Sequence, residues 1–132
     1  PFIMETESEK LTLELALKIT GSFPILFGVL MLLTPSSMME GFGVDVTEGM
    51  KMFAVYMGLL MILFGVAHWL VAMNVVENIN MFAKFFAAGH FSFILGDLYN
   101  YSTDVLPMDA ANIGNNVFTM LFVVILLMKS RD

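Results

Sequence analysis

The chain has 132 residues, of which 58% are hydrophobic and 14% charged, and its mean hydropathy is +0.83. A soluble domain is about 45–50% apolar and about 25% charged, and a chain this short cannot hide such a surplus of apolar surface in its own interior. The composition therefore excludes an ordinary soluble domain and favours a single membrane domain with the lipid bilayer as its partner. The net charge of −6 argues against a nucleic-acid partner, and the lack of cysteine excludes disulfides and cysteine-bound metals.

The first ten residues, Pro1–Lys10, are polar and acidic. They have neither the basic region nor the apolar region of a signal peptide. Two interpretations stay open: a shortened chain, or a mature end left after a targeting peptide was removed. Ser8 is expected to cap the first helix.

Four apolar stretches follow, and we expect them to span the membrane at about 11–33, 52–73, 79–98 and 113–128. The second has no charge in 22 residues, which at about 1.5 Å per residue is enough for a hydrocarbon core of about 30 Å. The segments between the stretches are rich in Gly, Pro, Asn and Asp and are expected to be loops. The predicted fold class is therefore all-α, a four-helix transmembrane bundle over residues 1–132.

The basic residues predict the orientation in the membrane. With four spans, both termini lie on the same side as the second loop. That side carries five of the six basic residues, and Lys51 alone lies on the other. Both termini are therefore expected on the cytoplasmic, stromal or matrix side.

A short pattern, G-x-x-x-I-L-F-G-V, occurs at Gly21–Val29 and again at Gly58–Val66. Chance is one explanation, since the sequence is apolar and of low complexity. The other is helix packing, because small residues seven apart share a helix face and let two backbones approach closely.

Polar residues inside a span are costly and need a reason. One group is expected at a similar depth, near the inner ends of the first three spans: Glu14, Lys18, His68 and Lys84. This layer could be a proton or ligand site. We favour the alternative, in which the lysines extend to the interface and His68 bonds a neighbour, because the adjacent Trp69 is typical of the interface.

His90 is expected near the middle of the third span, with no carboxylate at its depth, so that an acid–base pair is not predicted. An imidazole in lipid must be hydrogen-bonded or bound to a ligand. His90 and His68 are therefore candidate axial ligands of the magnesium of a chlorophyll or the iron of a haem. The alternative is a structural hydrogen bond between helices.

Other polar residues give weaker indications. Asp97 is expected to pair with Lys51 in a structural clasp at the outer end of the bundle. Two distant histidines do not predict a metal site, and no catalytic motif occurs, so we name no catalytic residue. The many phenylalanines could pack against carotenoid, chlorophyll or quinone rings, or against lipid and other helices.

The segment Lys51–Gly65, in which a basic residue opens an apolar helix and small residues follow, resembles the second helix of DoxX-like four-helix membrane proteins. The first span, with Gly21 and Gly28 followed by Pro35, is also similar, and the resemblance covers roughly the first 75 residues. Many members carry arginine where this chain has Lys51. The resemblance implies the four-helix fold, while the roles of the family are diverse and mostly unassigned.

The leading functional expectation is a non-catalytic accessory subunit of a larger membrane complex, since the chain has few polar groups and lies almost wholly within the membrane. Within this class the sequence favours a photosynthetic or respiratory assembly, in particular a photosystem subunit of the plastid thylakoid with chlorophyll and carotenoid contacts. The alternative is a DoxX-like oxidoreductase module that handles quinone or electrons. A small transporter ranks third.

Overall fold

The computed structural model describes residues 2–131, with side chains described from residue 12 onward. This part of the chain is helical throughout its regular elements. The helices are α1 (Phe2–Leu33), α2 (Pro35–Gly41), α3 (Glu48–Asn74), α4 (Ile79–Ser102) and α5 (Ala110–Lys129). All but α2 are long and apolar enough to cross a membrane, which confirms the predicted all-α four-helix transmembrane bundle.

Two details of the expected helix boundaries are wrong. Helix α1 begins at Phe2, so Ser8 lies inside this helix and does not cap it. The expected loop between the first two spans contains α2, which starts at Pro35 because proline suits the first turn of a helix.

The helices α3 and α5 begin earlier than their apolar stretches because polar side chains cap them. The Thr47 hydroxyl accepts a hydrogen bond from the backbone N–H of Met50 at 3.2 Å. The Asp109 carboxylate accepts one from the backbone N–H of Asn112 at 2.9 Å. Such caps satisfy amides that have no partner within the helix. The hydrophobic pattern marks the membrane-facing part of each helix, whereas the caps determine where the helix starts.

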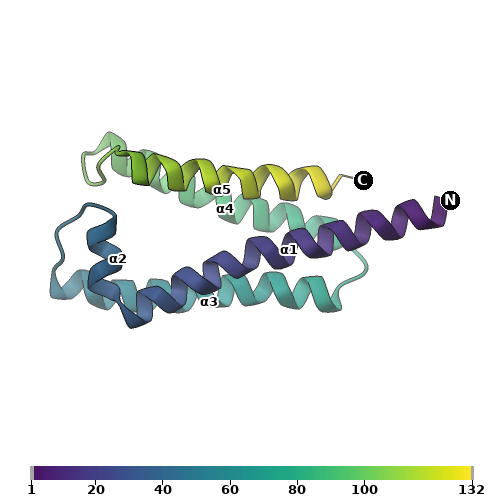
Figure 1. Cartoon of the computed structure of the whole chain (residues 1–132), viewed down its shortest axis with the longest axis horizontal. Helices are drawn as coiled ribbons and strands as arrows, with labels where there is room; N and C mark the ends of the chain where they lie inside the picture. The colour runs from purple at the N-terminus through teal and green to yellow at the C-terminus, as the bar shows by residue number, and fades with distance from the viewer. Residues whose placement is uncertain (1, 132) are drawn as a thin grey trace.

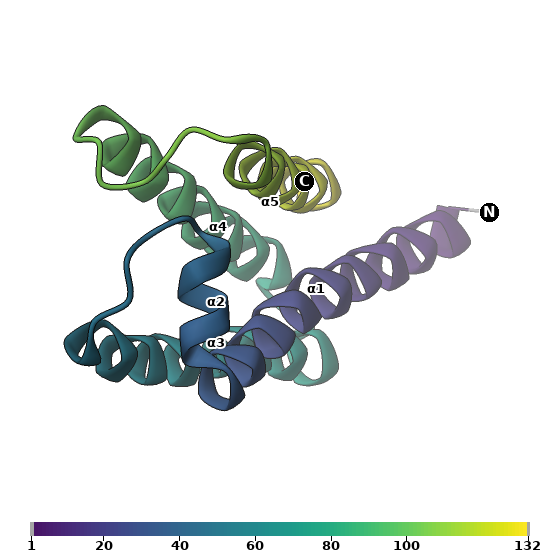
Figure 2. The ribbon, with the colours of Figure 1, turned by 60° about the vertical axis from the view of Figure 1, so that its left-hand side comes forward.

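The four long helices form two antiparallel pairs. Helix α1 packs along α3, and α4 packs along α5 (Figure 1). The pairs meet at the end of the bundle that holds the α3–α4 connection, and they diverge toward the other end, where α2 lies between them (Figure 2). We call the end where the pairs meet, near the α3–α4 connection, the closed end, and the end where they diverge around α2 the open end.

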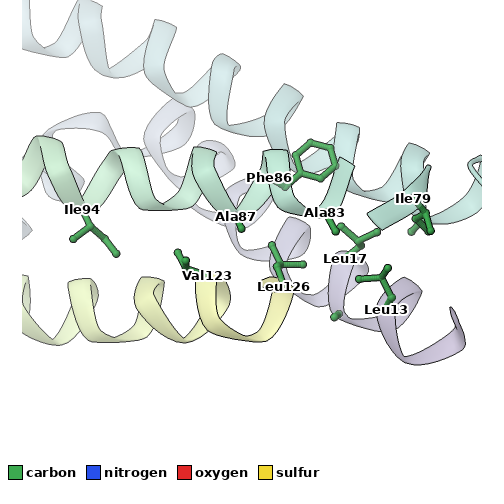
Figure 3. Close-up of a cluster of buried hydrophobic side chains, with 11 residues drawn as sticks. Leu13, Leu17, Ile79, Ala83, Phe86, Ala87, Ile94, Val123 and Leu126 are labelled. Atoms are coloured by element: carbon green, nitrogen blue, oxygen red, sulfur yellow. The ribbon is translucent and has the colours of Figure 1, made fainter. Parts of the chain in front are cut away.

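A cluster of buried apolar side chains lies toward the closed end (Figure 3). It includes Leu13 and Leu17 of α1, Ala83 and Ala87 of α4, and Leu126 of α5. Alanines on α4 leave room for the leucines of the neighbouring helices, so that three helices interlock at this end.

Four glycines bring α1 and α3 together. A Cβ atom on Gly28 would lie 2.5 Å from the Gly58 carbonyl oxygen, and one on Gly58 would lie 2.8 Å from the Gly28 carbonyl oxygen. Gly21 and Gly65 oppose each other in the same reciprocal way. The two backbones therefore touch at both levels, at a separation that leaves no room for any side chain.

These contacts give the repeated sequence pattern a structural role. A Cβ on Gly28 would meet Ile62 Cγ1 at 2.6 Å, and one on Gly65 would meet Ile25 Cγ1 at 2.5 Å, although these residues come from different copies of the pattern. Each copy therefore packs its last glycine against the isoleucine of the other, with local two-fold symmetry. The packing interpretation of the repeat agrees with this geometry.

Replacement of Gly28 by leucine should destabilise the protein by about 1–3 kcal/mol, because the side chain would force α1 and α3 apart. Gly96 provides the matched control, since a Cβ there meets nothing within 4 Å. The measurement is the midpoint of unfolding by sodium dodecyl sulfate in mixed micelles. Equal losses for Gly28→Leu and Gly96→Leu would contradict the packing role.

Candidate functional site

The two histidines meet in the centre of the bundle. The Nε2 atoms of His68 on α3 and His90 on α4 are 3.0 Å apart, which is hydrogen-bond distance. Both residues are buried, with exposed fractions of 0% and 3%. The imidazole pair is therefore a direct polar link between the two helix pairs.

The hydrogen bonds of the pair determine which nitrogen carries each proton. His68 Nδ1 lies 2.7 Å from the Phe64 carbonyl oxygen, which can only accept, so His68 Nδ1 must donate. In a neutral imidazole the other nitrogen is then an acceptor, and His68 Nε2 accepts from His90 Nε2–H. By the same rule, His90 Nδ1 carries a lone pair.

Aromatic rings surround the pair. Phe86 stacks on His68, with ring centroids 3.9 Å apart and an angle of 20° between the planes. Phe64 makes T-shaped contacts with both imidazoles, at centroid distances of 4.6 Å from His68 and 5.0 Å from His90. Phe122 of α5 approaches His90 at 5.5 Å. These rings keep water away from the pair and hold both imidazoles in position.

The hydrogen bonds of His68 agree with the favoured interpretation, in which His68 bonds a neighbour. Its partners are the Phe64 carbonyl and His90, which the sequence placed at a different depth in the membrane. The depth of a residue in the membrane was estimated by counting residues along its predicted span. Such a count assumes that the helices are parallel and that their ends are known. Because α3 and α4 belong to pairs that diverge, and each imidazole extends several ångströms from its axis, residues at different counted depths meet.

Lys18 and Trp69 form a separate contact. The Lys18 ammonium lies 5.5 Å from the centre of the Trp69 ring, within cation–π range. The Trp69 indole donates to the Ser22 hydroxyl at 3.1 Å. This arrangement agrees with the favoured interpretation of Lys18 and Trp69 as residues of the membrane interface.

A cavity of about 440 Å³ lies between the helix pairs, on the open side of the histidine pair. Its wall is mainly aromatic and methionine side chains, including Phe23, Phe27, Phe93, Phe118, Met57 and Met61. The polar residues in the wall are few: His90, Asp97, Asn100, Asn112, Asn115 and Thr119. An apolar cavity with a few polar groups is typical of small-molecule sites.

A second polar chain lies between α4 and α5. The Asn116 amide donates to the Asp97 carboxylate at 2.6 Å, and its oxygen accepts a short hydrogen bond from the Tyr101 hydroxyl. The expected Asp97–Lys51 clasp is therefore wrong. Lys51 instead pairs with Glu48 at 2.9 Å, because these residues share one face of the first turn of α3.

At the end of the cavity near α2, Asn112 connects two segments. Its side-chain amide donates to the carbonyl oxygens of Phe42 at 3.0 Å and Pro107 at 2.8 Å, and so joins the start of α5 to the segment after α2. Asn112 and Asn116 were not among the site residues predicted from the sequence. Their four-residue spacing, which places both on one face of α5, is a signal that could have indicated them.

The hydrogen bonds of the histidine pair limit which histidine nitrogens could act as axial ligands of a metal. Both ring nitrogens of His68 are used in hydrogen bonds, so this residue could ligate a metal only by giving one up. His90 retains Nδ1 for a ligand. Within the part of the chain that the structure describes, no group of three or more His, Asp or Glu side chains is placed to hold a metal ion.

Comparison with protein-family models, with curated proteins and with solved structures gave no match to this chain. The resemblance to DoxX-like proteins therefore stays a prediction from the sequence.

Replacement of either histidine alone should destabilise the protein more than replacement of both. His68→Phe or His90→Phe leaves one buried imidazole without its partner, at a cost of about 1–3 kcal/mol, whereas the double variant leaves none. Because each single loss should exceed that of the double variant, we expect the sum of the single losses to exceed the loss of the double variant by more than about 1 kcal/mol in unfolding titrations. His90→Phe combined with Gly96→Leu should be additive, and additivity for both combinations would contradict a direct bond.

Proposed function

We propose that the protein binds a lipid-soluble ring compound of the quinone or quinol class within the membrane. The observation that carries this proposal is the cavity of about 440 Å³ between the helix pairs, with His90 in its wall. The four apolar helices support this proposal, because a site between membrane-spanning helices is accessible to compounds dissolved in the bilayer.

The shape and chemistry of the wall support a flat ring. Ligand sites for small molecules have volumes of about 300–1,000 Å³ and mostly apolar linings. Here phenylalanines from α1, α3, α4 and α5 face the space, and aromatic side chains pack well on the edges and faces of planar rings. Methionines complete the lining, and their flexible side chains adapt to an alkyl tail.

The spacing of two polar groups in the cavity wall fits a ring that carries an oxygen atom at each end. His90 and Asp97 are seven residues apart on α4, which corresponds to about 10 Å along the helix. A six-membered ring with an oxygen at each end, and a hydrogen bond of about 2.8 Å from each oxygen, has a similar length. Quinones and quinols carry their oxygens in this way.

The other functional expectations rest on the sequence alone. An accessory subunit of a larger complex, a thylakoid location, chlorophyll and carotenoid contacts, and termini on the cytoplasmic or stromal side stay predictions. The quinone hypothesis differs from them in that a cavity of suitable chemistry supports it.

A variant that fills the cavity tests the proposal. Ala54 is 3% exposed and lies in the cavity wall, so Ala54→Phe should occupy the space and weaken binding of a short-tailed benzoquinone at least ten-fold. Ala88→Phe, on an exposed part of α4, is the matched control and should bind like the parent protein.

The measurement is calorimetric titration of the full chain in lipid nanodiscs, with empty nanodiscs subtracted to remove partitioning into lipid. We expect saturable binding near one ligand per chain. Binding by the parent protein that Ala54→Phe leaves unchanged would place the ligand elsewhere, and partitioning alone would contradict the proposed function.

A further inference from the structure

We infer that the site selects the reduced, hydroxyl-bearing form of its ligand, because His90 is fixed as a hydrogen-bond acceptor. This inference rests on the proposed function and deepens it from a ring compound to a hydroxyl donor of the quinol or phenol class. His68 does not contact the ligand. It is a positioning residue that determines which His90 nitrogen carries the proton.

A backbone carbonyl group determines which nitrogens of the two histidines donate and which accept. The Phe64 carbonyl oxygen can only accept, and it lies 2.7 Å from His68 Nδ1. This contact places a proton on His68 Nδ1 and a lone pair on His68 Nε2. The lone pair in turn requires a proton on His90 Nε2, at 3.0 Å. The lone pair of His90 Nδ1 is therefore left for a ligand in the cavity, and it favours a hydroxyl donor.

A ligand with only carbonyl oxygens would need the opposite arrangement. His90 Nδ1 would have to donate, and the neutral ring would then direct a lone pair from Nε2 toward the lone pair of His68 Nε2. If His68 moved its own proton to Nε2, the lone pair on Nδ1 would face the Phe64 carbonyl oxygen. Each neutral alternative therefore replaces one hydrogen bond with a repulsive contact.

Addition of a proton would remove the conflict, since both nitrogens of an imidazolium donate. That proton would create a charge among Phe64, Phe86 and Phe122, whose rings contact the pair. Burial of an ionised group in apolar surroundings is far more costly than the loss of one hydrogen bond. The neutral pair, with His90 as acceptor, is therefore the favoured state.

Asp97, the second polar group considered in the cavity wall, also favours a hydroxyl donor. Asp97 also lies in the wall, and its Oδ2 accepts from the Asn116 amide at 2.6 Å. A carboxylate is an acceptor only. A quinol could donate one hydroxyl toward His90 and the other toward Asp97, whereas a quinone presents an acceptor to both.

The test compares three probes on the full chain in nanodiscs: a short-tailed benzoquinol kept reduced, its benzoquinone and its dimethyl ether. The ether has the ring and the oxygens of the quinol but no hydroxyl. We expect the parent protein to bind the quinol at least ten-fold more tightly than either other probe, since two hydrogen bonds together favour the quinol by more than about a factor of ten.

Two variants separate the roles of the histidines. In His90→Phe the preference for quinol should fall several-fold while the affinity for the ether stays the same. In His68→Phe His90 is free to exchange its proton between nitrogens, so the affinity for the quinone should rise and the preference should fall although His90 is present. A purely structural role of His68 would instead change the affinity for all three probes together.

A spectroscopic measurement keeps the inference testable if either variant fails to fold. In the parent protein with ¹⁵N-labelled histidine, we expect His68 protonated at Nδ1 and His90 protonated at Nε2. The opposite tautomer of His90, or equal binding of the three probes, would overturn the inference and leave the proposed function standing. Absence of saturable binding for all three probes would overturn the proposed function itself.

Discussion

Close contact between α1 and α3 is the constraint on which the rest of the molecule depends. In lipid, burial of apolar surface gives little drive for helix association, so close packing and hydrogen bonds must hold helices together. The four facing glycines allow the backbones to touch. The contact also positions the candidate site, because a Cβ on Gly21 would lie 2.5 Å from His68 Cβ. His68 can occupy its place on α3 only because residue 21 has no side chain.

The cavity follows from the different packing of the two ends. At the closed end, leucines of α1 and α5 fit against alanines of α4. At the other end α2 lies between the pairs (Figure 2). Large side chains such as Phe53 and Phe118 line the cavity there. The histidine pair lies between these regions, where the interlocked core gives way to the cavity.

The sequence predicted the number of spans and the fold class because hydropathy over about 20 residues depends on local composition. It also contained the Gly21 and Gly58 repeat, which determines the packing of α1 on α3. It could not predict the pairing of His68 with His90, since that contact depends on how helices from different pairs diverge. The Asp97 clasp failed for a similar reason: the sequence shows which residues are polar, but the register of α5 beside α4 decides that Asn116 reaches Asp97.

Stability alone does not explain why two histidines occupy this place. A hydrogen bond between helices in a membrane contributes about 0.6 kcal/mol on average, and apolar groups of the same shape in both positions would be nearly neutral. The pair is surrounded by phenylalanines, so an all-aromatic core would fit the same space. What an aromatic core could not provide is an acceptor with a fixed direction in the wall of the cavity. The backbone carbonyl of Phe64 sets that direction, and His68 transmits it to His90.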